Sequence, residues 1–110
     1  MVKIDDSIVN TVKEFLVKVS NEGINITAAY IYGSYAKNTE HKWSDIDVAV
    51  ISPDFIKGRF EEGVRLAKIS KYVDSRIEPM PFSLETFVND NPLAWEIKKD
   101  GIPVSLKINA

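Results

Sequence analysis

The sequence predicts one small α/β domain, and three features of the chain indicate this fold class. Its 110 residues fit a single domain, so we expect residues 1–110 to fold as one unit. Hydrophobic residues make up 45% and charged residues 27%, the balance of a globular protein rather than a disordered one. Segments with helical periodicity alternate with short β-rich runs in the order αβ(α)βαβαα, which predicts a small sheet with flanking helices.

The first element is predicted to be a helix over roughly residues 6–21. Its apolar residues recur at intervals of three and four, which places them on one face of a helix. Asp5 or Asp6 can cap the start of this helix, and Gly23 favours its end.

Two strands are predicted next. Residues 26–32 are β-rich without clean alternation, which suits a strand that is covered on both faces and ends at Gly33. Residues 35–43 are polar, so one or two helical turns and a loop are expected there. Residues 45–51 alternate between two faces, as a strand does, and Pro53 favours the end of that strand.

A second long helix is predicted over about residues 55–73, with a broad apolar face. That expected face consists of Phe60, Val64, Ala67 and Ile69. A third strand is predicted over residues 76–82. Because Pro79 and Pro81 cannot donate hydrogen bonds to a ladder, this strand should lie at an edge of the sheet or leave the sheet early.

The C-terminal quarter predicts helices and a final strand. Residues 83–86 resemble a helix start. Asn91, followed by proline, opens another helix, and Gly101 closes it. A last apolar segment over residues 102–108 is expected to form a short strand.

The composition excludes several classes of protein. The formal net charge is −2 and the isoelectric point is about 5.4, whereas stable binding of nucleic acid needs clustered Lys and Arg. Without cysteine, the chain can form neither disulfides nor thiolate zinc sites. No apolar run has the length of a signal peptide or a membrane span, so we expect a cytoplasmic protein without membrane contact.

Asp45 and Asp47 give the main chemical signal. They stand two residues apart in a predicted strand, so both carboxylates leave the same face, about 6–7 Å apart. Like charges at this separation cost free energy unless a cation lies between them, and Mg²⁺ prefers carboxylate and phosphate oxygens. The pair alone is also compatible with the solvated face of an edge strand. Trp43, close before the pair, is a candidate wall of a pocket.

Gly33 and Ser34 predict a phosphate-binding turn upstream of the acids. Glycine at a strand end lets the backbone turn sharply and approach a ligand, and the amides that follow can donate to an anion. Ser34 adds a hydroxyl donor, although it is equally suited to capping a helix. Lys37 is a candidate for neutralising nucleotide phosphates, and a purely solvated role is as compatible with its position.

A third carboxylate is expected if two metal ions take part in phosphoryl-type transfer. Glu78, inside the third strand, is the first candidate, either as a metal ligand or as the base for an attacking hydroxyl. Asp74, before that strand, is the second candidate. The alternative for Glu78 is a surface ion pair with Arg76 or Lys71.

Two segments together resemble a known signature. Residues 33–37 (GSYAK) and 44–50 (SDIDVAV) are similar to the GSxAxG…SDxDxxV signature of the DNA polymerase β-like nucleotidyltransferase superfamily. The small size of the chain and residues 76–79 and 95–101 resemble the minimal nucleotidyltransferases within it. Asn38 stands where that family usually has glycine, and Glu78 where it more commonly has aspartate; asparagine tolerates a left-handed conformation.

The resemblance implies an α/β fold with a mixed sheet and a nucleotide-binding site. Ser34 would contact nucleotide phosphates, with Asp45, Asp47 and Glu78 binding Mg²⁺, expected as two ions, beside ATP or another nucleoside triphosphate. Such proteins are commonly encoded beside a HEPN-domain protein. They neutralise it as the antitoxin of a toxin–antitoxin pair, by complex formation, by adenylylation or by both.

Three functions follow from these observations. The first is Mg²⁺-dependent transfer of a nucleoside monophosphate, expected to be AMP, to a hydroxyl on a partner protein. The second is a non-catalytic nucleotide-binding antitoxin that neutralises its partner by complex formation, within a homo- or hetero-oligomer. Nucleotidylation of an antibiotic fits less well, because it generally needs further protein to build a substrate pocket.

Overall fold

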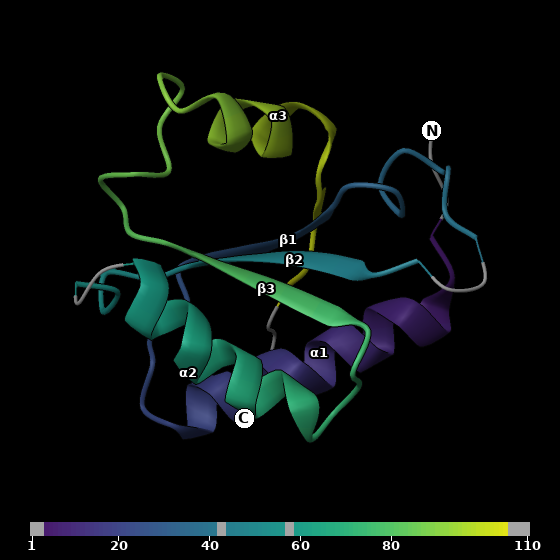
Figure 1. Cartoon of the computed structure of the whole chain (residues 1–110). Coiled ribbons are helices and arrows are strands. Elements are labelled where there is room, and N and C mark those ends of the chain that lie inside the picture. The colour runs from purple at the N-terminus through teal and green to yellow at the C-terminus, as the bar shows by residue number, and fades with distance from the viewer. Residues whose placement is uncertain (1–3, 42–43, 57–58, 106–110) are drawn as a thin grey trace.

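The structure, a computed structural model, describes residues 4–41, 44–56 and 59–105. Within these ranges the chain alternates helices and strands around one sheet (Figure 1). The elements in chain order are α1 (Asp6–Asn21), β1 (Ala28–Tyr32), β2 (Ile46–Ile51), α2 (Arg59–Lys71), β3 (Ile77–Phe82), α3 (Pro92–Asp100) and β4 (Ile102–Pro103).

The strands form a mixed sheet in the order β3-β2-β1-β4. β1 pairs antiparallel with both β2 and β4, whereas β2 pairs parallel with β3 and reaches it through α2. The predicted α/β fold with a mixed sheet and flanking helices is therefore confirmed. β3 lies at one edge of the sheet, where its two prolines are tolerated, as the sequence predicted.

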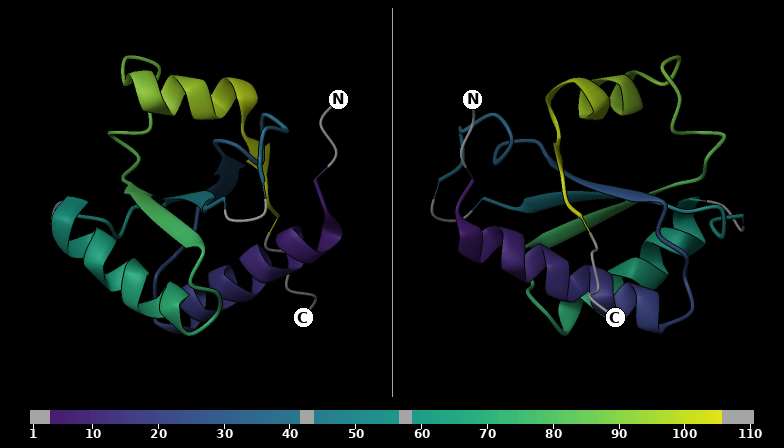
Figure 2. Two further views of the ribbon diagram at one scale, coloured as in Figure 1. Left: turned by 45° about the vertical axis from the view of Figure 1, so that its right-hand side comes forward. Right: turned by 180° about the vertical axis from the view of Figure 1, so that it is seen from behind.

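The sheet separates two apolar layers, with α1 and α2 over one face and α3 over the other (Figure 2). The layer under α1 and α2 is the larger, and its fully buried members include Val12, Phe15, Leu16, Ile31, Val48 and Leu66. The smaller layer under α3 contains Ala49, Ile51, Phe82, Ala94 and Ile97.

The first helix confirms the prediction from periodicity. The Asp5 carboxylate accepts a hydrogen bond of 2.8 Å from the backbone N–H of Ser7, so this aspartate is the cap. The chain leaves the helix at Gly23, whose φ of +89° is a left-handed conformation that glycine adopts without strain.

The register of the sheet decides which side chains meet. Ile46, Val48 and Val50 point into the larger core, so Asp47 lies on the opposite face, as the alternation predicted. On that face Asp47 is paired with Tyr32 of β1 on one side and with Glu78 of β3 on the other. Two of the predicted acidic residues are thus direct neighbours on adjacent strands.

The apolar face predicted for the second helix is largely wrong. Phe60 and Val64 are 82% and 40% exposed, and Ala67 is exposed as well, whereas only Ile69 packs against the core. The helix instead buries Leu66 together with two polar residues one turn away on either side, Glu62 and Ser70. A strong apolar stripe on α2 therefore remains at the surface.

Two further expectations need correction. Residues 83–86 form a turn rather than a helix. The backbone N–H groups of Ser83 and Thr86 each donate to the hydroxyl oxygen of the other residue, at 2.9 and 3.2 Å. The last strand is limited to β4, and residues 106–108 of the predicted strand lie outside the described residues. Among the helices of the described segments, none has the length and apolarity needed to cross a membrane.

Candidate functional site

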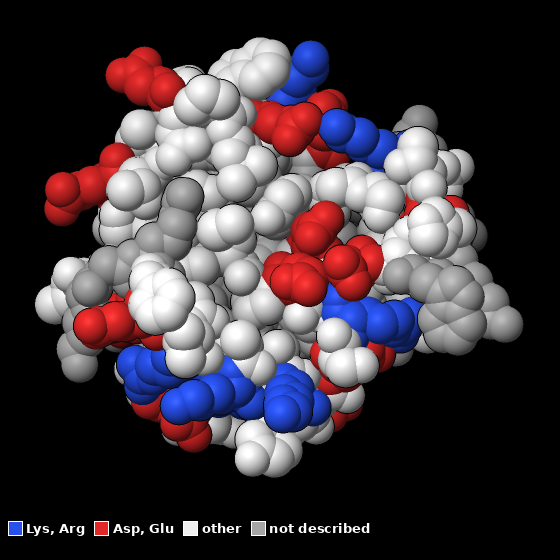
Figure 3. Space-filling model, in the orientation of Figure 1, with Lys and Arg blue, Asp and Glu red and all other residues white. Residues whose placement is uncertain are grey.

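The three predicted carboxylates come together on the face of the sheet that α3 covers only in part. Asp45 stands one residue before β2, Asp47 is the second residue of β2, and Glu78 lies beside Asp47 on β3. Asp45 and Glu78 are exposed, and Asp47 is partly buried. Figure 3 shows acidic side chains clustered at the centre of one face of the molecule, over the sheet. We call Asp45, Asp47 and Glu78 the acidic cluster.

The pKa of Asp47 reflects this clustering of carboxylates. Burial raises the pKa of its carboxyl, and the negative charges of Asp45 and Glu78 raise this pKa further. No basic side chain of the described residues is among the causes of that shift. The cluster therefore concentrates negative charge that a cation would neutralise, and its donors are the oxygens that Mg²⁺ prefers.

The acidic cluster is not a ready-made metal cage. Among the described residues no group of three His, Asp or Glu side chains stands close enough together to hold an ion. Carboxylates that share a site repel one another when no cation lies between them, so a looser arrangement is expected of the protein alone. The metal-binding role of the three acids stays a prediction that their chemistry fits.

Gly33 is held against the acidic cluster. Its φ of +74° favours glycine, and a Cβ atom on it would clash with Oδ2 of Asp47 and lie 3.2 Å from Cγ of the same carboxylate. The predicted close approach of the backbone to the acids is thus present. Any larger residue at this position would enter the space of the Asp47 side chain.

The turn after Gly33 presents free backbone donors. The N–H of Lys37 donates to the Gly33 carbonyl at 3.1 Å, and the N–H of Thr39 donates to the Ser34 carbonyl at 2.9 Å. Within the described residues, the intervening amides of Ser34, Tyr35 and Ala36 and the Ser34 hydroxyl make no hydrogen bond. This turn can therefore offer several donors to an anion beside the acidic cluster.

Asn38 completes the same turn in a left-handed conformation, with φ +58°. The sequence predicted that asparagine would tolerate this conformation in place of glycine, and the backbone angle confirms it.

Lys37 is already paired. Its ammonium lies 3.0 Å from Oε1 of Glu96 on α3, and this hydrogen bond raises the pKa of Lys37. The two side chains are 47% and 45% exposed, so solvent competes strongly with the pair. The pairing of Lys37 with Glu96 does not test the predicted contact between Lys37 and phosphate, which stays a prediction.

Arg76 joins Asp74 to the start of β2, and sequence reasoning missed this role. Its guanidinium donates to both carboxylate oxygens of Asp74, at 3.1 and 2.8 Å, and lies close enough to Tyr35 for the phenol to add to the raised pKa of Arg76. Its carbonyl accepts the N–H of Ile46 at 2.8 Å. The Asp74-Ser75-Arg76 spacing was the available signal, since an aspartate often bonds the backbone two residues on.

This ion pair separates the two candidates for the third carboxylate. The hydrogen bonds from Arg76 lower the pKa of Asp74 and engage both of its oxygens. Glu78 makes no ion pair with Arg76 or Lys71 within the described part of the chain, so its predicted surface pairing is absent there. Glu78 is therefore the carboxylate that is free to join Asp45 and Asp47.

Ser44 holds the loop that presents Asp45. Its buried hydroxyl accepts the backbone N–H of His41 at 2.9 Å, while its own N–H donates to the His41 carbonyl at 2.9 Å. The serine of the Ser44-Asp45 motif thus has a structural role, and His41 contributes backbone groups from an exposed position. Trp43, the predicted pocket wall, lies outside the described residues.

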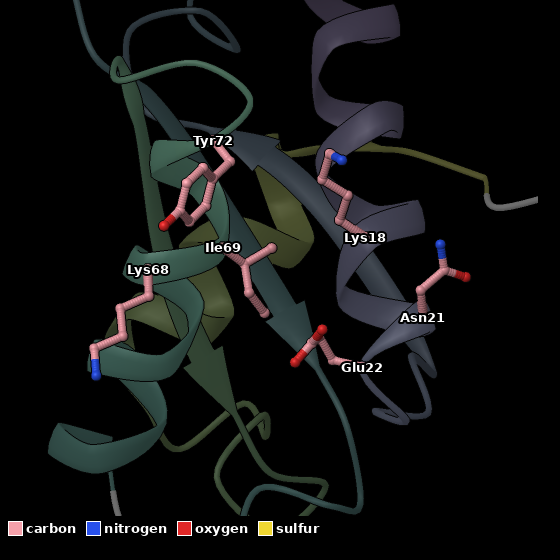
Figure 4. A pocket seen from close by; sticks show the side chains of 6 residues that line it. All are labelled: Lys18, Asn21, Glu22, Lys68, Ile69 and Tyr72. Atoms are coloured by element: carbon pink, nitrogen blue, oxygen red, sulfur yellow. The ribbon is translucent and has the colours of Figure 1, made fainter.

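A separate hollow of about 430 Å³ lies between the C-terminal ends of α1 and α2 (Figure 4). Lys18 and Lys68 point away from one another on its opposite sides, and Glu22 stands between them. Because its cations do not converge, this hollow does not form an anion site.

A comparison with protein families decides the affiliation of the chain. The model of the family described as "Nucleotidyltransferase domain" matches residues 9–101. The chain belongs to this nucleotidyltransferase domain family. The match spans the turn that begins at Gly33 and all three acids of the acidic cluster. A search of curated proteins finds no match.

Solved structures share the fold of this nucleotidyltransferase domain. A proposed nucleotidyltransferase from Sulfolobus solfataricus is 16% identical with a TM-score of 0.64, covering 88% of this chain and 78% of its own. A toxin–antitoxin with AMP-PNP is 23% identical with a TM-score of 0.57, covering 84% and 72%. A mutant of the toxin–antitoxin MntA-HpeT, in which two aspartates separated by one residue become glutamates, is 21% identical with a TM-score of 0.55, covering 84% and 72%. At these identities the likeness establishes the fold alone.

Proposed function

We propose that this nucleotidyltransferase domain transfers a nucleoside monophosphate, AMP in the first instance, from a nucleoside triphosphate to a hydroxyl on a partner protein. The observation that carries the proposal is the convergence of Asp45, Asp47 and Glu78 beside the turn that begins at Gly33. Metal-binding oxygens and anion-binding amides stand side by side, which is the combination that nucleotidyl transfer requires.

Each part of the site has a distinct task in this proposal. Asp45 and Asp47, with Glu78 as the third ligand, would hold Mg²⁺, expected as two ions. When bound, Mg²⁺ neutralises charge on the phosphates and on the reacting oxygens. The free amides from Ser34 to Ala36 hold a phosphate of the nucleotide and orient the chain of phosphates. Lys37 adds a positive charge to the triphosphate once it leaves Glu96.

The proposed transfer accounts for each bond that forms or breaks and for the proton that is released. The acceptor hydroxyl oxygen forms a bond to the α-phosphorus, and the bond from that phosphorus to the pyrophosphate oxygen breaks. The hydroxyl proton passes to a nearby carboxylate, for which the exposed Glu78 is the candidate, and from there to solvent. Pyrophosphate leaves, and the acceptor retains the nucleotide.

A protein acceptor is supported by the charge and size of the chain. Its net charge of −2 disfavours stable binding of a nucleic acid substrate, which needs an excess of clustered Lys and Arg. Two structural neighbours are toxin–antitoxin proteins, one of them with AMP-PNP, and the other is altered at two aspartates spaced as Asp45 and Asp47 are. We propose that this chain acts as a cytoplasmic antitoxin and that its partner is the HEPN-domain protein encoded beside it.

The test is label transfer from ATP labelled at the α-phosphate, in Mg²⁺, with and without the protein encoded beside this chain. Wild type and the Asp45→Asn/Asp47→Asn variant are compared, and complex formation is measured in parallel. Label on the partner with wild type alone is the expected result. No label from wild type, although the complex forms, would contradict transfer to that partner.

Two observations favour a second function. The acids form no preassembled ligand group among the described residues, and Lys37 is paired away from the phosphate-binding turn. Both features suit a nucleotide-binding antitoxin that neutralises its partner by complex formation without chemistry. Complex formation by both wild type and the double variant, with MgATP binding but no label transfer, is the result that this alternative predicts.

A further inference from the structure

The open edge of the sheet carries an apolar groove that runs into the acidic cluster. It encloses about 570 Å³ between α2 and β3, within the size range of ligand-binding clefts. Figure 1 shows β3 at the front of the sheet with α2 beside it. The groove is lined by Phe60, Gly63, Val64, Ala67, Glu78, Pro79, Met80 and Pro81.

The α2 wall of this groove is the apolar stripe that the core does not use. Phe60, Val64 and Ala67 recur at intervals of four and three, so they share one face of the helix. Phe60 is 82% exposed, although an aromatic side chain gains free energy from burial. Contiguous exposed apolar surface of this kind marks an interaction site.

The β3 wall excludes one type of occupant. The carbonyls of Arg76 and Phe82 accept hydrogen bonds from Ile46 of β2 and from Ser52, directly after β2. The even-numbered residues of β3 therefore direct their backbone toward β2. Pro79 and Pro81 therefore stand at the positions whose backbone faces outward, and neither has an N–H to offer. An added strand would find no donors there, so an occupant must dock through its side chains.

The two ends of the groove differ in character. Because β2 and β3 are parallel and joined by α2, that helix runs antiparallel to β3, and its C-terminal half lies near Glu78. Glu78 both lines the groove and adds its charge to Asp47. A molecule in the groove would thus reach the acidic cluster at one end and Phe60 at the other.

Basic side chains follow the apolar stripe on α2. Lys68 and Lys71 are exposed in the last turns of this helix, and Lys68 also borders the hollow beside α1. Figure 3 shows basic side chains in a row over α2, below the acidic cluster. Lys71 follows Ala67 by four residues, so it continues the groove-facing stripe toward Glu78.

We propose that the groove binds a short amphipathic helix of the partner protein and that this helix presents the acceptor hydroxyl to the acidic cluster. The α2 wall from Phe60 to Ala67 is about 10 Å long, which matches two helical turns. The apolar side of the docked helix fills the groove, and carboxylates on its flank face Lys68 and Lys71. This inference rests on the proposed transfer to a partner protein.

The test compares the Phe60→Glu and Phe60→Ala variants of the full chain with wild type. Because Phe60 is almost fully exposed, neither change should lower the melting temperature, which is measured first. The expected result is partner binding weakened by about tenfold or more, as for an aromatic anchor in an interface, with unchanged affinity of the chain alone for MgATP. Tyr72→Glu is the matched control, since Tyr72 is 84% exposed and lines the hollow beside α1 instead.

Each outcome has a defined meaning. Partner binding and label transfer at wild-type levels in both Phe60 variants overturn the inference, as does the absence of a complex with wild type. A loss of self-association in light scattering, with partner binding retained, would assign the groove to a second copy and also overturn it. Failure of the proposed function looks different: wild type binds its partner, yet transfers no label to it.

Discussion

The Asp47 carboxylate occupies the space that a side chain on Gly33 would need. Gly33 has φ +74°, and a Cβ on it would lie 3.2 Å from Cγ of Asp47 and in collision with Oδ2. The turn that begins at Gly33 and the acidic cluster are therefore fitted to one another at the backbone. A fixed distance between anion donors and metal-binding oxygens is what a nucleotide–metal complex requires.

We expect Gly33→Ala to destabilise the fold and to impair the site. The left-handed backbone and the contact with the carboxylate together should lower the free energy of unfolding by about 1–3 kcal/mol, and MgATP binding should be lost. Urea denaturation and calorimetric titration measure the two effects. Gly63→Ala is the control: a Cβ there meets nothing within 4 Å, so a gain of about 0.5–1 kcal/mol is expected. Wild-type stability in Gly33→Ala would refute the close fit.

Asp47 gives the protein a specific pH dependence. The folded-state pKa of this carboxyl is raised above its ordinary value of 3.8, so the native state binds the proton more tightly than the unfolded chain. Stability contributed by this group is present at low pH and is lost as pH rises through the raised pKa. Asp47→Asn should therefore raise the melting temperature at pH 7 without divalent cations. Mg²⁺ should stabilise wild type and not the variant; equal stabilisation of both would place Mg²⁺ elsewhere.

The Arg76–Asp74 pair should contribute more than the Lys37–Glu96 pair. Two hydrogen bonds join Arg76 to a carboxylate that is 21% exposed, whereas Lys37 and Glu96 share one contact and are about half exposed. Double-mutant cycles should give a coupling of about 1 kcal/mol for the first pair and a clearly smaller coupling for the second.

The coupling between Arg76 and Asp74 should also depend on pH. The pKa of Asp74 is lowered from 3.8 by hydrogen bonds from Arg76, so the stability it contributes is present above that value and lost as pH falls through the folded-state pKa. If the coupling between Arg76 and Asp74 persisted at pH values well below the folded-state pKa of Asp74, packing rather than charge would hold the pair together.

Substitution of the third carboxylate should separate the two candidates for its role. Glu78→Gln is expected to reduce label transfer by about 100-fold or more, with little change in melting temperature because the side chain is exposed. Asp74→Asn should leave transfer close to wild type, since Arg76 engages that carboxylate outside the acidic cluster. If Asp74→Asn reduced label transfer and Glu78→Gln did not, Asp74 would be the third carboxylate of the site.

Local chemistry in the sequence determined most of the elements and several backbone features around the candidate site. The periodicity of the first helix, the alternation around Asp47 and the glycine at position 33 each depend on neighbours a few residues away, so each could be predicted and is confirmed. The left-handed conformation of Asn38 was predictable for the same reason, since it depends on the residue type itself.

Only the tertiary structure decided what depends on packing between distant segments. The sequence predicts that the stripe including Phe60 faces the core. In the structure α2 buries Leu66 instead, because burial depends on how the helix is rotated about its axis relative to the strands. Pairing of Asp47 with Glu78 depends on the register of β2 and β3, which are connected through a whole helix. The effect of Tyr35 on the pKa of Arg76 likewise involves residues 41 positions apart, and no local pattern encodes their proximity.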